Sequence, residues 1–314
     1  MALNEAVDKK SPKGSRQGIR YHLKTLLLFT KSDVKTVLIP QSVFALALAF
    51  SKARSILAPD ATVADLVCRI PCMLAWLWLH LLVTAIANQR RPEDVLEDKE
   101  NKPWRPMPSG RLSTSQARGL LRAAAWVSLG TSLLCGSLAP SISLMVLLWL
   151  YNDLGGSSVS PVERNLITTG GLSCFGWGAV SALVGGDISP EGESLLKKWM
   201  VLMGAMMATT VQAQDFPDTV GDTARGRRTI PVVYGSTVAR LSLVIPAVVW
   251  SWVCPAFWHV GVPAWLAPVG IGGWMIGQTL LARWEQRGNE RVWRLWCFWQ
   301  TVMYLMPLFG RFSE

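Results

Sequence analysis

The feature that most constrains this chain is a succession of long apolar segments separated by short polar loops. A membrane-spanning helix needs about 20 mostly apolar residues. Only 17% of the 314 residues are charged, against about 25% in a typical soluble domain. Soluble, disordered and coiled-coil classes are therefore excluded. We predict an all-α integral membrane protein with nine transmembrane helices, near 36–52, 63–88, 114–135, 140–155, 163–184, 195–214, 237–258, 263–283 and 291–309.

The basic residues predict how the chain lies in the bilayer. Residues 1–35 form a basic tail followed by an amphipathic stretch at 21–35, which we expect to lie on the membrane surface. The tail has no apolar core, so it does not resemble a secretory signal. Lys and Arg residues concentrate on the side of the tail, which places the N-terminus in the cytoplasm. Residues 36–314 then form one membrane domain in the endoplasmic reticulum or another endomembrane, or alternatively in a bacterial inner membrane.

A repeat follows the second and the sixth predicted helices. Each copy has an amide residue, an acidic group, a basic strip with Pro, a Gly and a Ser-Thr pair, with acidic motifs at 88–98 and 215–222. Four predicted helices separate the copies, so both lie on the cytoplasmic side. Related halves of membrane proteins commonly build their site at the interface between them. We therefore expect one site that combines both motifs.

The acidic groups predict a metal site. Their members are three or four residues apart, which places them on one face of a helix. Crowded carboxylates raise each other's pKa unless cations intervene, and Mg²⁺ binds a few carboxylates together with phosphate oxygens. The spacing predicts as metal ligands Asp94, Glu97, Asp98, Asp215, Asp218 and Asp222, of which Asp98, Asp218 and Asp222 are the catalytic candidates.

Basic and polar residues near these motifs predict the ligand. Cationic side chains complement phosphate charge, and a site walled by membrane helices selects an apolar tail, so a prenyl diphosphate fits both. Polar residues close to a membrane segment are functional candidates, although a solvated loop or an ordinary helix end remains the alternative for each group. The predicted diphosphate ligands are Lys102, Arg105, Arg225, Arg228, Tyr151 and Asn152, with Arg227 and Arg164 nearby.

These residues resemble the motifs of the UbiA superfamily of intramembrane prenyltransferases. The matching stretches are 88–98, the strip Asn101-Lys102-Pro103-Trp104-Arg105-Pro106, the motif 215–222 and the turn 225–228. The resemblance implies a UbiA-like bundle with a cytoplasmic polar cap and an apolar central cavity, Mg²⁺ as cofactor and Asn88 as a further metal ligand. Pro92 and Pro217 are expected to interrupt the helices that carry the motifs.

The altered first motif resembles a fungal branch of the superfamily, the membrane terpene cyclases typified by the bergamotene synthase of fumagillin biosynthesis. Resemblance to that branch implies cyclisation of farnesyl diphosphate to a sesquiterpene, with no obligate protein partner. The alternative is transfer of the prenyl group to an aromatic acceptor; a transporter or a membrane scaffold is less favoured, and no basic module for nucleic acid is present. A cyclase needs rings that stabilise positive charge, and the candidates are Trp76, Trp78, Trp149, Trp177, Trp199, Trp250 and Trp252.

Overall fold

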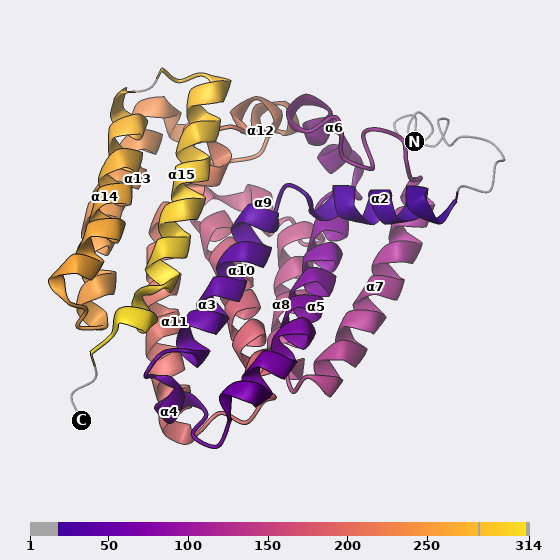
Figure 1. Cartoon of the computed structure of the whole chain (residues 1–314). Coiled ribbons are helices and arrows are strands. Elements are labelled where there is room, and N and C mark those ends of the chain that lie inside the picture. The colour runs from indigo at the N-terminus through magenta and orange to yellow at the C-terminus, as the bar shows by residue number, and fades with distance from the viewer. Residues whose placement is uncertain (1–17, 282, 312–314) are drawn as a thin grey trace.

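The computed structural model describes residues 18–281 and 283–311, so the predicted basic tail at 1–17 lies outside the described residues. Within these two ranges the chain is helical and contains no strand. Long helices lie side by side, and two short helices, α6 and α12, lie at the end of the bundle near α2 (Figure 1). The all-α prediction is confirmed for the part of the chain that the structure describes.

Each of the nine predicted segments contains a helix. Among the described residues they are α3 (Ile39–Ala49), α5 (Val63–Ala87), α7 (Thr114–Leu134), α8 (Leu138–Asn152), α10 (Pro161–Val184), α11 (Pro190–Thr210), α13 (Ile230–Phe257), α14 (Val262–Leu281) and α15 (Gln286–Tyr304). The remaining elements are α2 (Ile19–Thr30), η1 (Val34–Leu38), α4 (Arg54–Leu57), α6 (Pro92–Asn101), α9 (Gly156–Val159), η2 (Val211–Asp215), α12 (Thr219–Arg225) and η3 (Met306–Phe309).

Three of the described helices, α5, α10 and α13, are long and apolar enough to cross a membrane. A fourth candidate is the pair formed by α2 and residues 34–49, which bends by 58°. The bend carries α2 across the end of the bundle, over α5 and α7 in the view of Figure 1. An amphipathic helix in this position is the arrangement expected for the 21–35 segment, although the helix itself ends at Thr30.

Local sequence explains where the helices begin. Thr62 and Ser113 accept hydrogen bonds from the backbone N–H three residues later and form capping boxes at α5 and α7. Pro161 and Pro190 stand in the first turns of α10 and α11, where a missing N–H costs nothing. The starts of these four helices accordingly lie close to the starts of the predicted apolar segments.

The repeat seen in the sequence has a counterpart in the backbone. Gly110 and Gly235 both have positive φ, 70° and 80°, a conformation that glycine adopts without steric cost. In the first copy Gly110 lies in the turn that precedes α7, and the helix itself begins at Thr114. In the second copy the chain is already helical, and Gly235 introduces a kink inside α13.

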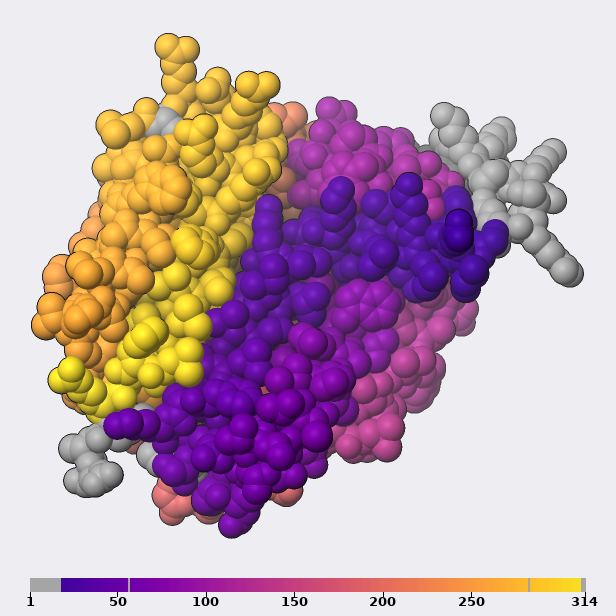
Figure 2. Space-filling model, viewed as in Figure 1, coloured from indigo at the N-terminus to yellow at the C-terminus, as the bar shows by residue number. Residues whose placement is uncertain are grey.

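The interior is held by close approach of α5 to α10 and α8. The ring of Trp76 lies where a side chain at Gly178 would be, since a Cβ there would come within 1.9 Å of it. His80 is fully buried and hydrogen-bonds through its ring nitrogens to the Trp76 carbonyl at 2.8 Å and the Ser141 hydroxyl at 2.7 Å. His80 therefore links α5 to α8 by an interhelical hydrogen bond. Side chains of α15 and α3 meet along the face shown in Figure 2.

Candidate active site

Helix α6 presents the first acidic motif on its buried face. Pro92 begins the helix, and the Asp94 carboxylate accepts a hydrogen bond from the Arg91 backbone N–H at 3.2 Å. Asp94, Glu97 and Asp98 are buried, whereas Glu100 on the same helix is exposed. The expected interruption at Pro92 is confirmed, because α5 ends at Ala87 and a new helix starts at Pro92.

The second motif does not lie on one helix. Asp215 ends the 3₁₀ segment η2, and α12 starts only at Thr219, with Asp218 at its N-cap. The single helix face expected for Asp215, Asp218 and Asp222 is therefore absent. Pro217 explains the break, since proline has no N–H for the helical ladder and its ring clashes with the preceding turn.

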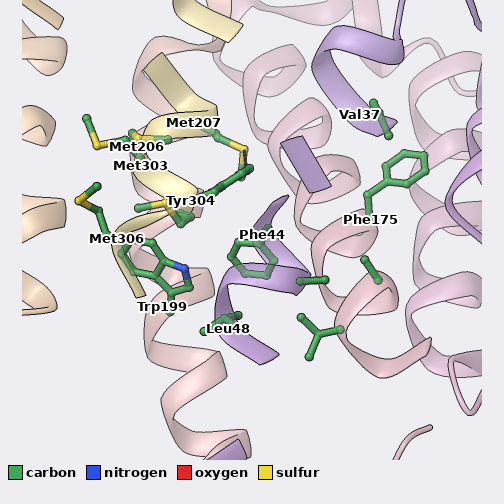
Figure 3. Packing of buried hydrophobic residues seen from close by; sticks show 14 of the residues in the cluster. Val37, Phe44, Leu48, Phe175, Trp199, Met206, Met207, Met303, Tyr304 and Met306 are labelled. Carbon is green, nitrogen blue, oxygen red and sulfur yellow. Dashed lines mark hydrogen bonds between the residues drawn. The ribbon is translucent and has the colours of Figure 1, made fainter. Parts of the chain in front are cut away.

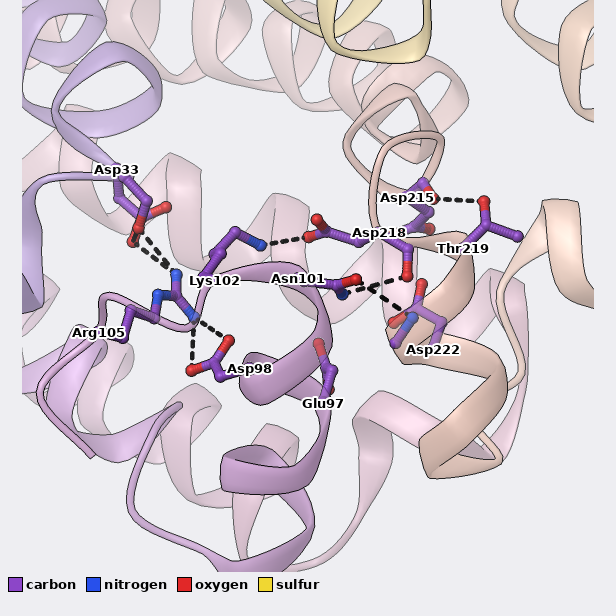
Figure 4. Close-up of polar contacts among 12 residues, drawn as sticks. Asp33, Glu97, Asp98, Asn101, Lys102, Arg105, Asp215, Asp218, Thr219 and Asp222 are labelled. Atoms are coloured by element: carbon purple, nitrogen blue, oxygen red, sulfur yellow. Dashed lines mark hydrogen bonds and ion pairs between the residues drawn. The ribbon is translucent and has the colours of Figure 1, made fainter. Parts of the chain in front are cut away.

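The two motifs are joined by ion pairs that cross between them. Arg225 contacts Asp94 at 2.6 Å and Glu97 at 2.9 Å. Arg227 bridges Glu97 at 2.9 Å and Asp222 at 3.2 Å. In the opposite direction, Lys102 of the first motif contacts Asp218 at 2.6 Å, as Figure 4 shows. The structure therefore assembles one site from two segments more than 100 residues apart.

Asn101 and Gly221 make a second bridge between the motifs. The Asn101 amide donates to the Asp218 carbonyl at 3.2 Å and accepts from the Gly221 N–H at 3.2 Å. A Cβ at Gly221 would lie 2.3 Å from the Asn101 amide nitrogen. The Gly is therefore required by the close approach of Asn101. The sequence places both residues in motifs but does not reveal that they touch.

Arg164 joins the site from the start of α10. Its guanidinium contacts Asp215 at 2.6 Å and donates to the Tyr151 hydroxyl. Arg164 and Asp215 are both buried. The sequence alone left Arg164 undecided between the phosphate and an anchoring role. The structure brings it, together with Tyr151, to the second acidic motif.

Arg105 lies at the edge of the site beside α2. It contacts both carboxylate oxygens of Asp98, at 2.8 and 3.0 Å, and donates to the Ser32 hydroxyl at 2.8 Å. It also approaches Asp33 at 3.8 Å. Ser32 and Asp33 were not predicted from sequence, because they lie in the turn after α2, and Ser32 precedes Arg105 by 73 residues.

Three of the predicted residues lie apart from this network. The Asn88 side chain accepts a hydrogen bond from the Asn152 amide at 2.9 Å, so these two residues pair with each other. The pair ties the C-terminal end of α5 to that of α8. Arg228 is exposed. The basic residue that turns inward after α12 is its neighbour Arg227.

Charge is incompletely balanced at the centre of the site. Burial raises the pKa of Asp222 to about 7 and that of Asp94 to about 6, although Arg164 and Arg225, respectively, oppose the shift. Burial also acts on Asp218, but Lys102, Arg105 and Arg164 together outweigh it and lower the pKa of that carboxyl. One Asp222 oxygen, Oδ2, is buried and has no hydrogen-bond partner among the described residues. The site thus contains an acceptor oxygen available for a cation.

The donor set fits a hard divalent cation. All six motif carboxylates offer oxygen ligands, which Mg²⁺ prefers, and the unpartnered Asp222 oxygen lies among them. In the described residues no three acidic, His or Cys side chains stand close enough together to hold a metal ion. Basic side chains lie between the carboxylates instead, so cation binding would require Arg and Lys to exchange partners.

The sequence matches the UbiA prenyltransferase family over residues 42–302. The chain belongs to that family. Its members are integral membrane enzymes, and the resemblance inferred from the motifs is confirmed. The bundle described above is accordingly a UbiA fold.

Individual relatives and structures agree with this assignment. The fumagillin β-trans-bergamotene synthase of Aspergillus fumigatus is 30% identical over 292 residues, which cover 92% of this chain and 93% of the relative. A polyprenyl transferase of Hericium erinaceus is 28% identical over 71% of this chain and 72% of its own length. The structure of a UbiA homolog from Archaeoglobus fulgidus bound to DMAPP and Mg²⁺ has a TM-score of 0.57 and 14% identity, covering 89% of this chain and 99% of that one.

Proposed function

We propose that this chain is a Mg²⁺-dependent enzyme that ionises a prenyl diphosphate in the membrane and cyclises farnesyl diphosphate to a sesquiterpene. The alternative is a prenyltransferase that moves the prenyl group to an aromatic acceptor. The single observation that carries the proposal is the pairing of the six carboxylates of the two motifs with five cations in one largely buried site.

This pairing is suited to a ligand that is itself a cation–anion pair. A magnesium diphosphate offers Mg²⁺ to the carboxylates and phosphate oxygens to Arg and Lys. Each carboxylate would then replace a basic side chain with a metal ion, and each basic side chain would replace a carboxylate with a phosphate oxygen. Lys102, Arg105 and Arg225 would then bind phosphate oxygens. Asp98, Asp218 and Asp222 would hold Mg²⁺, with Asp94, Glu97 and Asp215 beside them. Bound Mg²⁺ supplies charge stabilisation to the departing diphosphate.

Three predicted site residues lie farther from the paired charges and have indirect roles in this proposal. Tyr151 would act through Arg164, to which its hydroxyl is hydrogen-bonded. Asn88 would have to release Asn152 before its oxygen could reach a metal. Arg228, which is exposed after α12, would be a peripheral phosphate ligand.

The bond changes of the proposed reaction are simple. The bond between C1 and the diphosphate oxygen breaks, and its electron pair leaves with diphosphate. In a cyclase, a distal double bond of the same chain supplies the pair for the new C–C bond, and a proton is then lost to the diphosphate. In a transferase, an aromatic ring supplies that pair and loses the proton. Similarity to the bergamotene synthase over nearly the whole chain supports the first course.

We also propose the membrane arrangement. All nine long helices cross the bilayer, α2 lies at the headgroups, and the motif-bearing end forms a polar cap that faces the cytoplasm. The concentration of Lys and Arg at that end supports this orientation. An endomembrane such as the endoplasmic reticulum fits an apolar substrate.

The deciding experiment is to incubate membranes that contain the protein with farnesyl diphosphate and Mg²⁺ alone. We expect diphosphate release and a hydrocarbon with the mass of the farnesyl group less one proton, both absent from an Asp222→Ala control. Prenylated products that form only after an aromatic acceptor is added would make the chain a transferase. No diphosphate release under either condition would refute the proposal.

A further inference from the structure

The interior of the bundle is nearly filled by side chains. Apolar residues such as Phe44, Leu48 and Phe175 are buried and pack together, as Figure 3 shows. A cavity between α3, α10, α11 and α15 has a volume of about 10 Å³, close to the space that one water molecule needs. The apolar central cavity implied by the sequence resemblance is therefore almost closed. A further partner has more room on the outside of the bundle, where α2 lies (Figure 2).

Helix α2 exposes a row of apolar side chains. Ile19, Leu23 and Leu27 are successively four residues apart, which places them along one side of the helix. They are 71%, 53% and 60% exposed, respectively. A helix that crosses the end of a membrane bundle with such a row buries it in the interface of the bilayer.

A row of basic side chains runs beside the apolar row. Arg20 and Lys24 are four residues apart, Lys31 follows seven residues later, and all three are exposed. At 3.6 residues per turn they lie within about 40° of one another around the helix axis. Residues 18–31 contain no Asp or Glu. Basic side chains at a bilayer surface are attracted to anionic headgroups, so the exposed side of α2 is complementary to an anionic lipid surface.

The opposite side of α2 is attached to residues 102–111, the segment that carries two predicted phosphate ligands. The Arg111 guanidinium donates to the Thr25 hydroxyl at 3.0 Å and to the Tyr21 carbonyl at 3.1 Å. It also lies 3.9 Å from the centre of the Tyr21 ring. The Tyr21 hydroxyl in turn donates to the Arg111 carbonyl at 3.1 Å. The first two turns of the helix are therefore fixed to the end of this segment.

The C-terminal end of α2 contacts the middle of the same segment. Arg105 donates to the Ser32 hydroxyl at 2.8 Å, and the Lys31 ammonium lies 5.0 Å from the centre of the Trp104 ring. Between these contacts and the motif stands Lys102, which pairs with Asp218 at 2.6 Å. Because α2 holds the segment at two places, a displacement of the helix would also displace Lys102 and Arg105.

We propose that α2 binds an anionic lipid surface and thereby holds residues 102–111 in the position that binds diphosphate. This inference rests on the proposed function, because it uses the phosphate ligands proposed there, and it adds a lipid class and a positioning residue, Arg111. Arg111 contacts α2 and acts on the diphosphate through Lys102 and Arg105. Lipid and diphosphate favour the same position of the segment, so each should strengthen the binding of the other.

The first test measures diphosphate binding in bilayers of two compositions. The full chain is placed in nanodiscs of phosphatidylcholine alone or of equal parts phosphatidylcholine and phosphatidylserine, and inorganic diphosphate with Mg²⁺ is titrated calorimetrically. Phosphatidylserine should tighten diphosphate binding roughly fivefold. Arg20→Gln combined with Lys24→Gln should remove this difference. Lys197→Gln combined with Lys198→Gln should keep it, since these exposed lysines lie in the first half of α11, the end away from the motifs.

The second test breaks the link between α2 and the segment. In nanodiscs with phosphatidylserine, Arg111→Gln should weaken diphosphate binding about tenfold, because the two hydrogen bonds from its guanidinium to α2 are lost. The variant should also lose the response to phosphatidylserine, which a loss of stability alone would not remove from the folded protein. Arg118→Gln is the matched control, since Arg118 is exposed in the first turns of α7. If Arg111→Gln fails to fold, Tyr21→Phe, which removes one hydroxyl, should have a smaller effect in the same direction.

The outcomes separate this inference from the proposed function. Equal diphosphate affinity in the two bilayers overturns the inference and leaves the proposed function intact. An equal gain from water-soluble glycerophosphoserine would overturn it too, because a free anion would then replace the lipid surface. A full response to phosphatidylserine in Arg111→Gln would remove Arg111 from the link. Wild-type protein that binds no diphosphate with Mg²⁺ in either bilayer refutes the proposed function itself.

Discussion

The charged end of the bundle and the cavity in its interior handle polar groups in opposite ways. At the charged end each motif carboxylate is paired with Arg or Lys. In the interior, between α3, α10, α11 and α15, a cavity of about 10 Å³ is lined by neutral side chains, among them Gln41, Phe44 and Tyr304. Paired charges can exchange partners with an ionic ligand, whereas neutral side chains have no charge to exchange. An ionic ligand is therefore expected at the charged end and not at the interior cavity.

Removal of Mg²⁺ should have the largest effect on the charged end. A metal ion contributes several kcal/mol to stabilisation of the leaving group, so excess chelator should slow diphosphate release by at least about a thousandfold. Added Mg²⁺ should restore it. Diphosphate release that persists in chelator would show that the carboxylates do not hold a required metal.

Asp222→Ala should lower diphosphate release by about 10²–10³-fold, because it removes the buried oxygen that has no partner in the described structure. Glu100→Ala is the matched control, since Glu100 is an exposed carboxylate at the same end of the bundle. Diphosphate release is measured for both, with thermal unfolding as the check on folding. Equal activity in the two variants would contradict the two-motif site.

Gly221→Ala should reduce kcat by up to about a hundredfold, because a displacement of about 1 Å at the motifs disturbs their alignment. The added Cβ would collide with the Asn101 side chain. Adding Asn101→Ala should cause little further loss, since both substitutions disturb one contact. Strictly additive losses would show that Gly221 acts elsewhere.

Lys102→Ala should have the smallest of these effects, a rise in KM of about tenfold, since a hydrogen bond to a charged group is worth about 1.5–3 kcal/mol. The substitution also frees the Asp218 carboxylate, which the ammonium contacts at 2.6 Å. Steady-state kinetics with farnesyl diphosphate measure it. If neither KM nor kcat changes, Lys102 does not bind the substrate.

Much of the site could be predicted because its residues lie in two compact motifs. Carboxylates three and four residues apart, followed by basic strips, indicate metal and phosphate chemistry in any fold. Arg164 and Ser32 were harder to place, since each contacts the motifs from a segment distant in sequence. The aromatic lining was also hidden. The abundance of Trp drew attention to those side chains, yet Trp149 and Trp252 are exposed, and the rings at the cavity belong to Phe44 and Tyr304.

By itself the sequence determined the helical segments, the membrane class and the two acidic motifs, because apolar length and residue spacing are local properties of the chain. The tertiary structure decided which opposite charges pair, that Pro217 divides the second motif, and which neutral groups face the interior cavity. These depend on how helices far apart in sequence pack against one another. The hydrogen bond from Gln300 to Tyr304 could be expected, because the two residues are four apart on one helix. The hydrogen bond from Gln41 could not, because Gln41 lies 263 residues away on another helix.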